Sequence, residues 1–200
     1  MLVSEQRLVD AAAELFYRRG IAATGVDAVA AKSGVSKPTL YARFGTKAAL
    51  VAAVLADHHQ RRRESLTDHL ADRGDLSPAE RLLSVFDWIA AHQRGDWGRG
   101  CPFVNASVEL VRPEDAPARQ VIAAHKRWFR SVLAELAAQA GASEPARLAS
   151  GLHVLIEGAN ARMLAEADTS AIATARDVAE LLVARAHRPA GDTPLGEEQS

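Results

Sequence analysis

Residues 34–47, GVSKPTLYARFGTK, place two glycines, a serine and a proline among only three large apolar side chains. Gly34 suits a left-handed turn, and Ser36 suits the N-cap of a helix that follows it. Pro38 is tolerated in the first turn of that helix, where backbone amides have no intrahelical acceptor. Gly45 ends the helix. The stretch therefore predicts short helices that meet at a sharp corner.

Helical periodicity continues through the rest of the chain, and no hairpin signature interrupts it. Alanine is abundant while β-branched and aromatic residues are sparse, and this composition favours helix. We therefore predict an all-α fold of about nine helices. The expected helices cover roughly residues 5–19, 26–33, 36–44, 47 to the loop at 72–78, 78–94, 102–111, 117–140, 145–166 and 168 or 170 to 187, with further loops at 95–100 and around 113–117.

The distribution of charge matters more than its sum. The net charge of −1 by itself argues against a nucleic-acid-binding protein. Residues 1–63, however, hold ten Lys and Arg against five Asp and Glu, while the remainder holds 14 against 20. A basic head on an acidic body indicates a local site for a polyanion.

The sequence lacks a cysteine pair, a signal peptide and a membrane-spanning segment, and these absences indicate the expected cellular location. Cys101 is the single cysteine, so no intrachain disulfide can form and a reducing cytoplasm is the expected location. The N-terminus has no apolar run of a signal peptide, and no stretch is apolar enough to span a bilayer. We expect no contact with a membrane.

Three short N-terminal helices with a sharp turn around 34–36 describe a helix-turn-helix. In that motif the second helix of the pair enters the major groove, with its N-terminal residues nearest the bases. An ordinary capped corner would use the same residue types, so the ordered set rather than any one residue favours DNA. The predicted contacts with double-stranded DNA are Thr24, Ser36, Lys37, Pro38, Thr39, Tyr41 and Lys47.

Residues 7–55 resemble the N-terminal DNA-binding domain of TetR-family transcriptional regulators. The resemblance is carried by the Phe16 to Gly20 helix end, Val29 and Ala30 before Gly34, the run GVSKPTLYARF, and Lys47 with Leu50. It implies three N-terminal helices on a ligand-binding, dimerising helical body, and DNA contacts at the same seven positions. Asp27 departs from a basic residue that many members place there, so we assign it no DNA role.

We expect three segments: a helix-turn-helix domain at 1–46, a ligand-binding and dimerisation domain at 47–188, and a disordered polar tail at 189–200. By resemblance, the last two helices form a four-helix bundle in a homodimer, although burial within one subunit is the alternative. Two-fold symmetry implies a pseudo-palindromic operator. The predicted dimerisation residues are Leu152, Leu155, Ile156, Ala159, Met163, Val178 and Leu182, with Gly151 and Gly158 allowing close approach.

Aromatic residues gather in the fifth to eighth predicted helices, which is typical of an apolar cavity for a small-molecule inducer. Some of them must simply belong to the core. The aromatic candidates are Phe86, Trp88, Trp97, Phe103, Trp128 and Phe129, and the polar candidates are His92, Asn105, Glu109, His125, His153 and Glu157.

Cys101 precedes a helix that begins with proline, and Arg99 lies nearby, so its thiol is a candidate for raised reactivity. The segment also resembles a Gly-Cys-x-x-x-Asn stretch found in a subset of TetR-like regulators, some of which respond to electrophiles or oxidants. A small buried side chain is the alternative. Neither metal-ligand spacing nor a cofactor motif is present.

The predicted function is therefore a homodimeric repressor that a small-molecule inducer releases from its operator. A thiol-based sensor acting through Cys101 is the alternative form of this regulator. Two rivals from other classes remain: an enzyme that pairs Cys101 with His125 or His153, and an architectural DNA-binding protein without a ligand. We expect no enzymatic activity.

Overall fold

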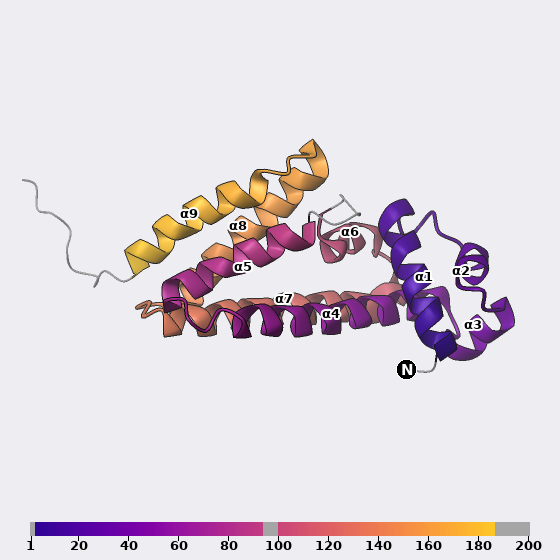
Figure 1. The fold of residues 1–200 in the computed structure, drawn as a ribbon. Helices are drawn as coiled ribbons and strands as arrows, with labels where there is room; N and C mark the ends of the chain where they lie inside the picture. The colour runs from indigo at the N-terminus through magenta and orange to yellow at the C-terminus, as the bar shows by residue number, and fades with distance from the viewer. Residues whose placement is uncertain (1–2, 94–99, 187–200) are drawn as a thin grey trace, which may run out of the picture.

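The computed structural model describes residues 3–93 and 100–186. The predicted polar tail, the loop at 95–99 and Trp97 lie outside these described residues. The described helices are α1 (Val3–Arg19), α2 (Val26–Ser33), α3 (Lys37–Phe44), α4 (Lys47–Ala71), α5 (Pro78–Gln93), α6 (Pro102–Glu109), α7 (Ala116–Gln139), α8 (Pro145–Glu166) and α9 (Ala171–Ala186), with a short 3-10 helix at Pro113–Asp115 (Figure 1).

The all-α prediction is confirmed. Two boundaries differ from the predicted ones for local reasons. A 3-10 turn replaces part of the connection around 113–117, where the Asp115 carboxylate accepts from the Arg112 amide at 3.0 Å. Helix α9 begins at Ala171 because the Asp168 carboxylate accepts from the amide and hydroxyl of Ser170, at 2.8 and 2.6 Å, just before the helix starts.

Helices α1 to α3 form a small head at one end of the molecule (Figure 1). Gly34 adopts a φ of 65°, which gives the left-handed turn between α2 and α3. Ser36 caps α3 by accepting a hydrogen bond from the Thr39 amide at 3.3 Å, as the sequence predicted. Leu40 is completely buried and fixes α3 against the rest of the head.

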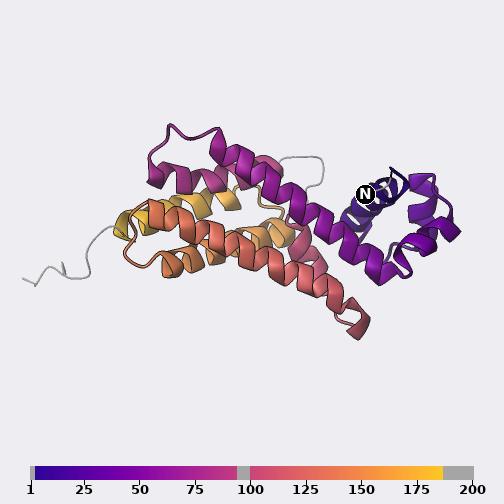
Figure 2. The same cartoon turned by 90° about the horizontal axis from the view of Figure 1, so that it is seen from below.

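Helix α4 joins the head to the body. It runs from the head along the length of the body and packs beside α7 (Figures 1 and 2). Its N-cap is Thr46, whose hydroxyl accepts from the Ala49 amide at 3.1 Å. The cap therefore fixes where the head ends and the connecting helix begins.

We expect Thr46→Ala to lower the free energy of unfolding by about 1 kcal/mol, because the Ala49 amide loses its acceptor. Thr46 is exposed, so no cavity forms and the effect is confined to the cap. Urea unfolding followed by circular dichroism measures it, with Thr67→Ala, at an exposed position within the same helix and far from its N-cap, as the matched control. Equal stabilities of the two variants would contradict the capping role.

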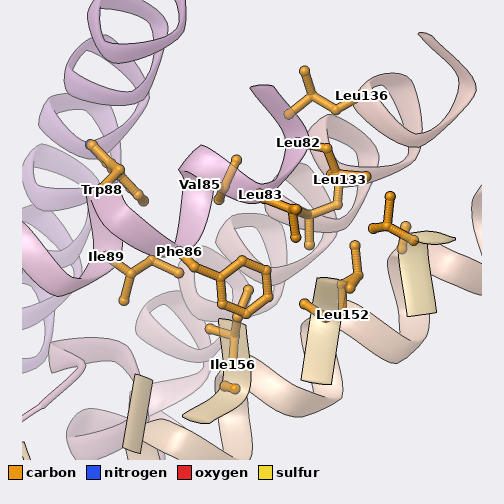
Figure 3. Close-up of a cluster of buried hydrophobic side chains, with 14 of the residues drawn as sticks. Leu82, Leu83, Val85, Phe86, Trp88, Ile89, Leu133, Leu136, Leu152 and Ile156 are labelled. Carbon is orange, nitrogen blue, oxygen red and sulfur yellow. The ribbon is translucent and has the colours of Figure 1, made fainter. Parts of the chain in front are cut away.

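Two apolar clusters hold the structure together. The larger lies in the body, where Phe86 on α5 points between Leu152 and Ile156 of α8 (Figure 3). The smaller fills the head, but it also contains Phe103 of α6 and Ile122 of α7. The head is thus packed onto the body through a shared apolar cluster. Because the cluster is close-packed, a movement of α6 or α7 must displace side chains of the head.

Among the described residues, no single helix is long and apolar enough to cross a membrane. Only the pair α3 and α4, bent by 73°, meets the length and composition requirement when taken together.

Candidate DNA interface and ligand cavity

Most of the predicted DNA-binding residues share one exposed surface on α3 and the turn before it. Ser36, Lys37 and Pro38 are exposed, Thr39 is half-buried, and Tyr41 is 44% exposed. This surface lies at the end of the molecule farthest from the body (Figures 1 and 2). No described part of the body covers it in residues 3–93 and 100–186, so the start of α3 is accessible to a duplex.

Lys37 is held by a neighbour that sequence reasoning left without a role. Its ammonium group lies 2.7 Å from the Asp27 carboxylate, and this pairing raises the pKa of Lys37. Both side chains are largely exposed. Asp27 therefore stands beside the predicted phosphate contact, where it orients the lysine in the free protein and competes with a phosphate for it.

Arg7 on α1 is a basic neighbour of this surface that the sequence did not reveal. A Cβ atom added to Gly34 would lie 2.7 Å from an Arg7 guanidinium nitrogen. The cation thus lies directly over the turn of the motif. Arg7 and Gly34 are far apart in the sequence, so the sequence alone did not predict their contact. They meet only because α1 crosses over the helix-turn-helix.

Two predicted contacts turn inward instead. Thr24 is 1% exposed, and its hydroxyl donates to the backbone carbonyls of Gly20 at 2.7 Å and Leu15 at 3.3 Å. Its side chain stabilises the turn after α1, which corrects its prediction as a DNA contact. Lys47 donates to the Ile21 carbonyl at 2.5 Å, and burial lowers its pKa. Lys47 must leave that carbonyl to reach a phosphate.

A cavity of about 580 Å³ lies between the head and the body. That volume falls within the usual range for small-molecule sites. Residues of α1, α4, α5, α6, α7 and α8 line it, so both the head and the body contribute to its wall. The predicted residues in its wall are Trp88, His92, Cys101, Phe103, Asn105, Glu109, His125, Phe129 and Glu157.

Three predicted cavity residues lie elsewhere. Phe86 is 1% exposed and belongs to the apolar core of the body (Figure 3). Trp128 packs against that core, with its ring 5.4 Å from the ring of His59. His153 is buried beside Phe129 but does not reach the cavity wall. These three stabilise the helix packing around the cavity.

The sequence analysis did not predict that α1 and α4 contribute to the cavity wall. Tyr17 lines the cavity from α1, and His58, Arg61 and Arg62 line it from α4. The run of three arginines was interpreted as a solvated helix face. That interpretation is wrong for Arg62, whose guanidinium carbon lies 3.9 Å from the centroid of the Trp88 ring.

Two cavity histidines are kept neutral. The His125 ring stacks on Phe103 with centroids 3.7 Å apart, and burial, helped by nearby cations, lowers its pKa to about 2. Burial and the charges of Arg62 and Arg61 lower the pKa of His58 to about 4. At neutral pH both imidazoles therefore add polarity to the cavity but no charge.

The lowered pKa of His58 predicts a loss of stability in mild acid. The unfolded chain takes up the proton near pH 6.5, whereas the folded chain resists it down to about pH 4, so stability falls as pH falls through this window. Between pH 7 and pH 5 we expect His58 to account for about 2 kcal/mol of lost unfolding free energy. Urea unfolding at both values, with His58→Asn for comparison, measures this. An equal loss in the variant would contradict it.

The cavity wall is tied directly to the head. The Tyr17 hydroxyl on α1 donates to the Gly100 carbonyl at 2.9 Å, just before α6. The Glu109 carboxylate at the end of α6 accepts from the Ala22 amide at 2.8 Å. Both ends of α6 are thus hydrogen-bonded to the head, and a shift of α6 must move or break these bonds.

The predicted dimerisation stripe lies mostly inside one subunit. Leu152, Ile156, Ala159 and Met163 are each at most 5% exposed, which corrects their assignment to an intersubunit surface. Leu155 and Leu182 are half-buried against the same core. Only Val178 of the predicted set has substantial exposure, at 39%.

Helices α8 and α9 nevertheless each expose large apolar side chains. Val154 on α8 is 68% exposed and Leu181 on α9 is 67% exposed. Leu164 and Val178 add partly exposed apolar surface on the same two helices. Large apolar side chains left in water on adjacent helices are typical of an interaction surface.

Comparison with known proteins places these features in a family. Residues 8–54 match the profile of bacterial regulatory proteins of the tetR family, and residues 78–179 match the tetracyclin repressor-like C-terminal domain. A TetR-family transcriptional regulator from Streptomyces coelicolor superposes with a TM-score of 0.81 at 26% identity, covering 92% of this chain and 96% of that one. A regulator from Streptomyces avermitilis gives 0.73 at 32% identity, over 90% and 99%.

Curated relatives match over shorter segments. The HTH-type transcriptional repressor BdcR of Escherichia coli is 31% identical over 117 residues, which are 58% of this chain and 56% of that protein. The HTH-type transcriptional activator FasR of Mycolicibacterium smegmatis is 48% identical over 52 residues, 26% of this chain and 24% of FasR. The chain thus matches between a quarter and somewhat over half of the length of these two relatives.

Proposed function

Since the chain belongs to the TetR family of DNA-binding transcriptional regulators, we propose that it is a homodimeric repressor released from its operator by a small molecule. Its family makes it a regulator and not an enzyme. Residues 1–46 act as the DNA-binding domain and residues 47–188 as the ligand-binding and dimerisation domain.

The observation that carries this proposal is the composition of the cavity wall. One cavity is lined by α1 of the head, by α4 that connects head and body, and by α6 whose two ends are hydrogen-bonded to the head. A ligand that fits one position of these helices better than another shifts the equilibrium between them. The shift changes the spacing of the two heads and hence the affinity for DNA.

The exposed α3 surface supplies the contact with DNA. Lys37 and Tyr41, together with Arg7 over the turn, reach phosphates, while Thr39 at the start of α3 is placed to meet a base edge. Two such surfaces, related by the two-fold axis of a dimer, engage successive major grooves. The operator is accordingly a pseudo-palindrome.

A dimer forms through the exposed apolar face of α8 and α9 around Val154 and Leu181. Figure 1 shows α9 on the side of the body opposite α4. The connecting helix therefore remains free to move while the subunits stay together.

The experiment is a selection of duplex fragments from the genome that encodes this chain, followed by release with a compound panel. We expect a small set of related palindromic fragments, and at least one compound that lowers their affinity. Recovery of unrelated fragments with similar affinity, unaffected by any compound, would instead indicate an architectural protein. A reporter driven by a selected fragment distinguishes repressor from activator.

A second candidate, thiol sensing, is favoured by the position of Cys101. Its side chain lines the cavity, stands at the N-cap of α6 and lies near Arg62. A change at this thiol acts on the same helix that is tied to the head. Iodoacetamide treatment of the native protein tests it by intact mass: an unmodified Cys101, or a modified protein with full operator affinity, ends this candidate.

A further inference from the structure

Arg62 differs from the other charged residues in the cavity wall. Every acidic side chain there already has a partner: Asp10 and Asp57 bind Arg61, Glu14 binds Lys32, Glu109 binds the Ala22 amide, and Glu157 binds Lys126. Within residues 3–93 and 100–186, no carboxylate lies within ion-pair distance of Arg62. Arg62 is the cation of the described cavity wall that has no carboxylate partner, whereas Arg61 and Lys126 are both paired.

The environment of Arg62 makes that charge available to a ligand. The guanidinium lies over the Trp88 ring, and burial lowers its pKa to about 10, so it remains cationic at neutral pH while losing much of its hydration. A cation removed from water is costly to the folded chain unless an anion offsets it. Arginine also binds carboxylates and phosphates in a bidentate geometry that lysine lacks.

A second feature of the wall favours the same sign of ligand charge. The N-terminus of α6 faces the cavity, since Gly100, Cys101, Pro102 and Phe103 all line it. The side chain of Cys101, the N-cap residue, makes no capping hydrogen bond. Its first-turn amides and the positive end of its dipole therefore add to the field of Arg62.

Apart from the charged side chains already named, the wall is apolar or neutral. Phe103 and Phe129 contribute aromatic surface, Ile89 and Leu55 contribute aliphatic surface, and His125 is uncharged at neutral pH. Such a wall favours a ligand with a flat or bulky apolar body.

We propose that this cavity selects an organic anion with an aromatic or otherwise apolar body, and that Arg62 binds its anionic group. The inference rests on the proposed ligand-responsive function and names the chemical class of its ligand. It also assigns Arg62 as the residue that determines charge selectivity.

Calorimetric titration of the full chain, without DNA, tests the proposal. The probes are naphthoate, naphthamide and naphthamidine, together with the matching biphenyl series, because each set keeps the shape while its charge changes from negative to neutral to positive. We expect the carboxylates to bind at least about tenfold more tightly than the amides, since they form a charge-assisted bidentate hydrogen bond. The amidines should bind most weakly.

Substitutions assign the preference to Arg62. Arg62→Met should bring carboxylate affinity down to that of the amide while leaving amide affinity unchanged, which also shows that the cavity is intact. Arg62→Gln repeats the test if the methionine variant does not fold, and Arg62→Lys should keep part of the preference. Arg63→Met is the matched control, because Arg63 is exposed on the same helix and does not line the cavity, and it should keep the preference.

Three results would overturn the inference: amides that bind the native chain as tightly as carboxylates, a preference that survives Arg62→Met, or no binding by any probe of either series at millimolar concentration. Operator binding is measured separately. If the chain prefers carboxylates but does not bind DNA, only the proposed function is refuted. If it binds the operator but does not prefer carboxylates, only this inference is refuted.

Discussion

We expect Lys37→Ala combined with Tyr41→Ala to weaken operator binding by at least about a hundredfold. Both side chains lie on the exposed start of α3, and in a dimer the double substitution removes four contacts. At roughly 1 kcal/mol for each phosphate contact, the loss exceeds two factors of ten. A fluorescence anisotropy titration with the selected fragment at fixed salt measures it.

The control is Arg130→Ala, which removes an exposed cation from α7 in the body and should leave operator affinity unchanged. The slope of log affinity against log salt should also become shallower in the double variant, because fewer counterions are released on binding. Unchanged affinity and slope in the double variant would show that α3 does not face the duplex.

The second large effect is expected at the dimer surface. Val154→Arg combined with Leu181→Arg places positive charges on the exposed apolar residues through which we propose that the subunits meet. We expect sedimentation velocity to show monomers. Operator affinity should fall by roughly 10²–10⁴-fold, because a single head loses the effective concentration that the second head provides.

Val108→Arg is the matched control for this surface. Val108 is 71% exposed and belongs to α6, not to α8 or α9, so the variant should remain dimeric. A native-like dimer with full operator affinity after both interface substitutions would place the subunit contact elsewhere.

The sequence predicted the helices well because their ends depend on local chemistry. Ser36 and Thr46 cap α3 and α4 through the amide three residues on, and Gly34 takes the left-handed turn between α2 and α3. None of these features needs a distant partner. The helix-turn-helix was therefore visible in a short stretch of chain.

The cavity was predictable only in part. Its aromatic wall was found, because a concentration of aromatic residues is a compositional signal. The roles of Tyr17 and Arg62 were not found, because they depend on how α1 and α4 cross the body. The run of three arginines does not indicate by itself which side chain points into the cavity.

The predicted dimerisation residues differ from the exposed ones for a different reason. The strongest apolar stripe of α8 contains Leu152 and Ile156, and the structure buries it in the core of its own subunit. Periodicity shows that a helix face is buried but not against what. The weaker exposed face around Val154 emerges only once the core is known.

The central claim is that two α3 surfaces of one dimer lie in successive major grooves of a duplex. Footprinting of a selected genomic fragment with dimethyl sulfate tests it most directly, because this reagent methylates the guanine N7 atom in the major groove. We expect two protected clusters with centres about one helical turn apart, roughly 34–36 Å, and loss of both in the Lys37 and Tyr41 double variant. Guanines that stay fully reactive at low ionic strength, or clusters that persist in that variant, would contradict it.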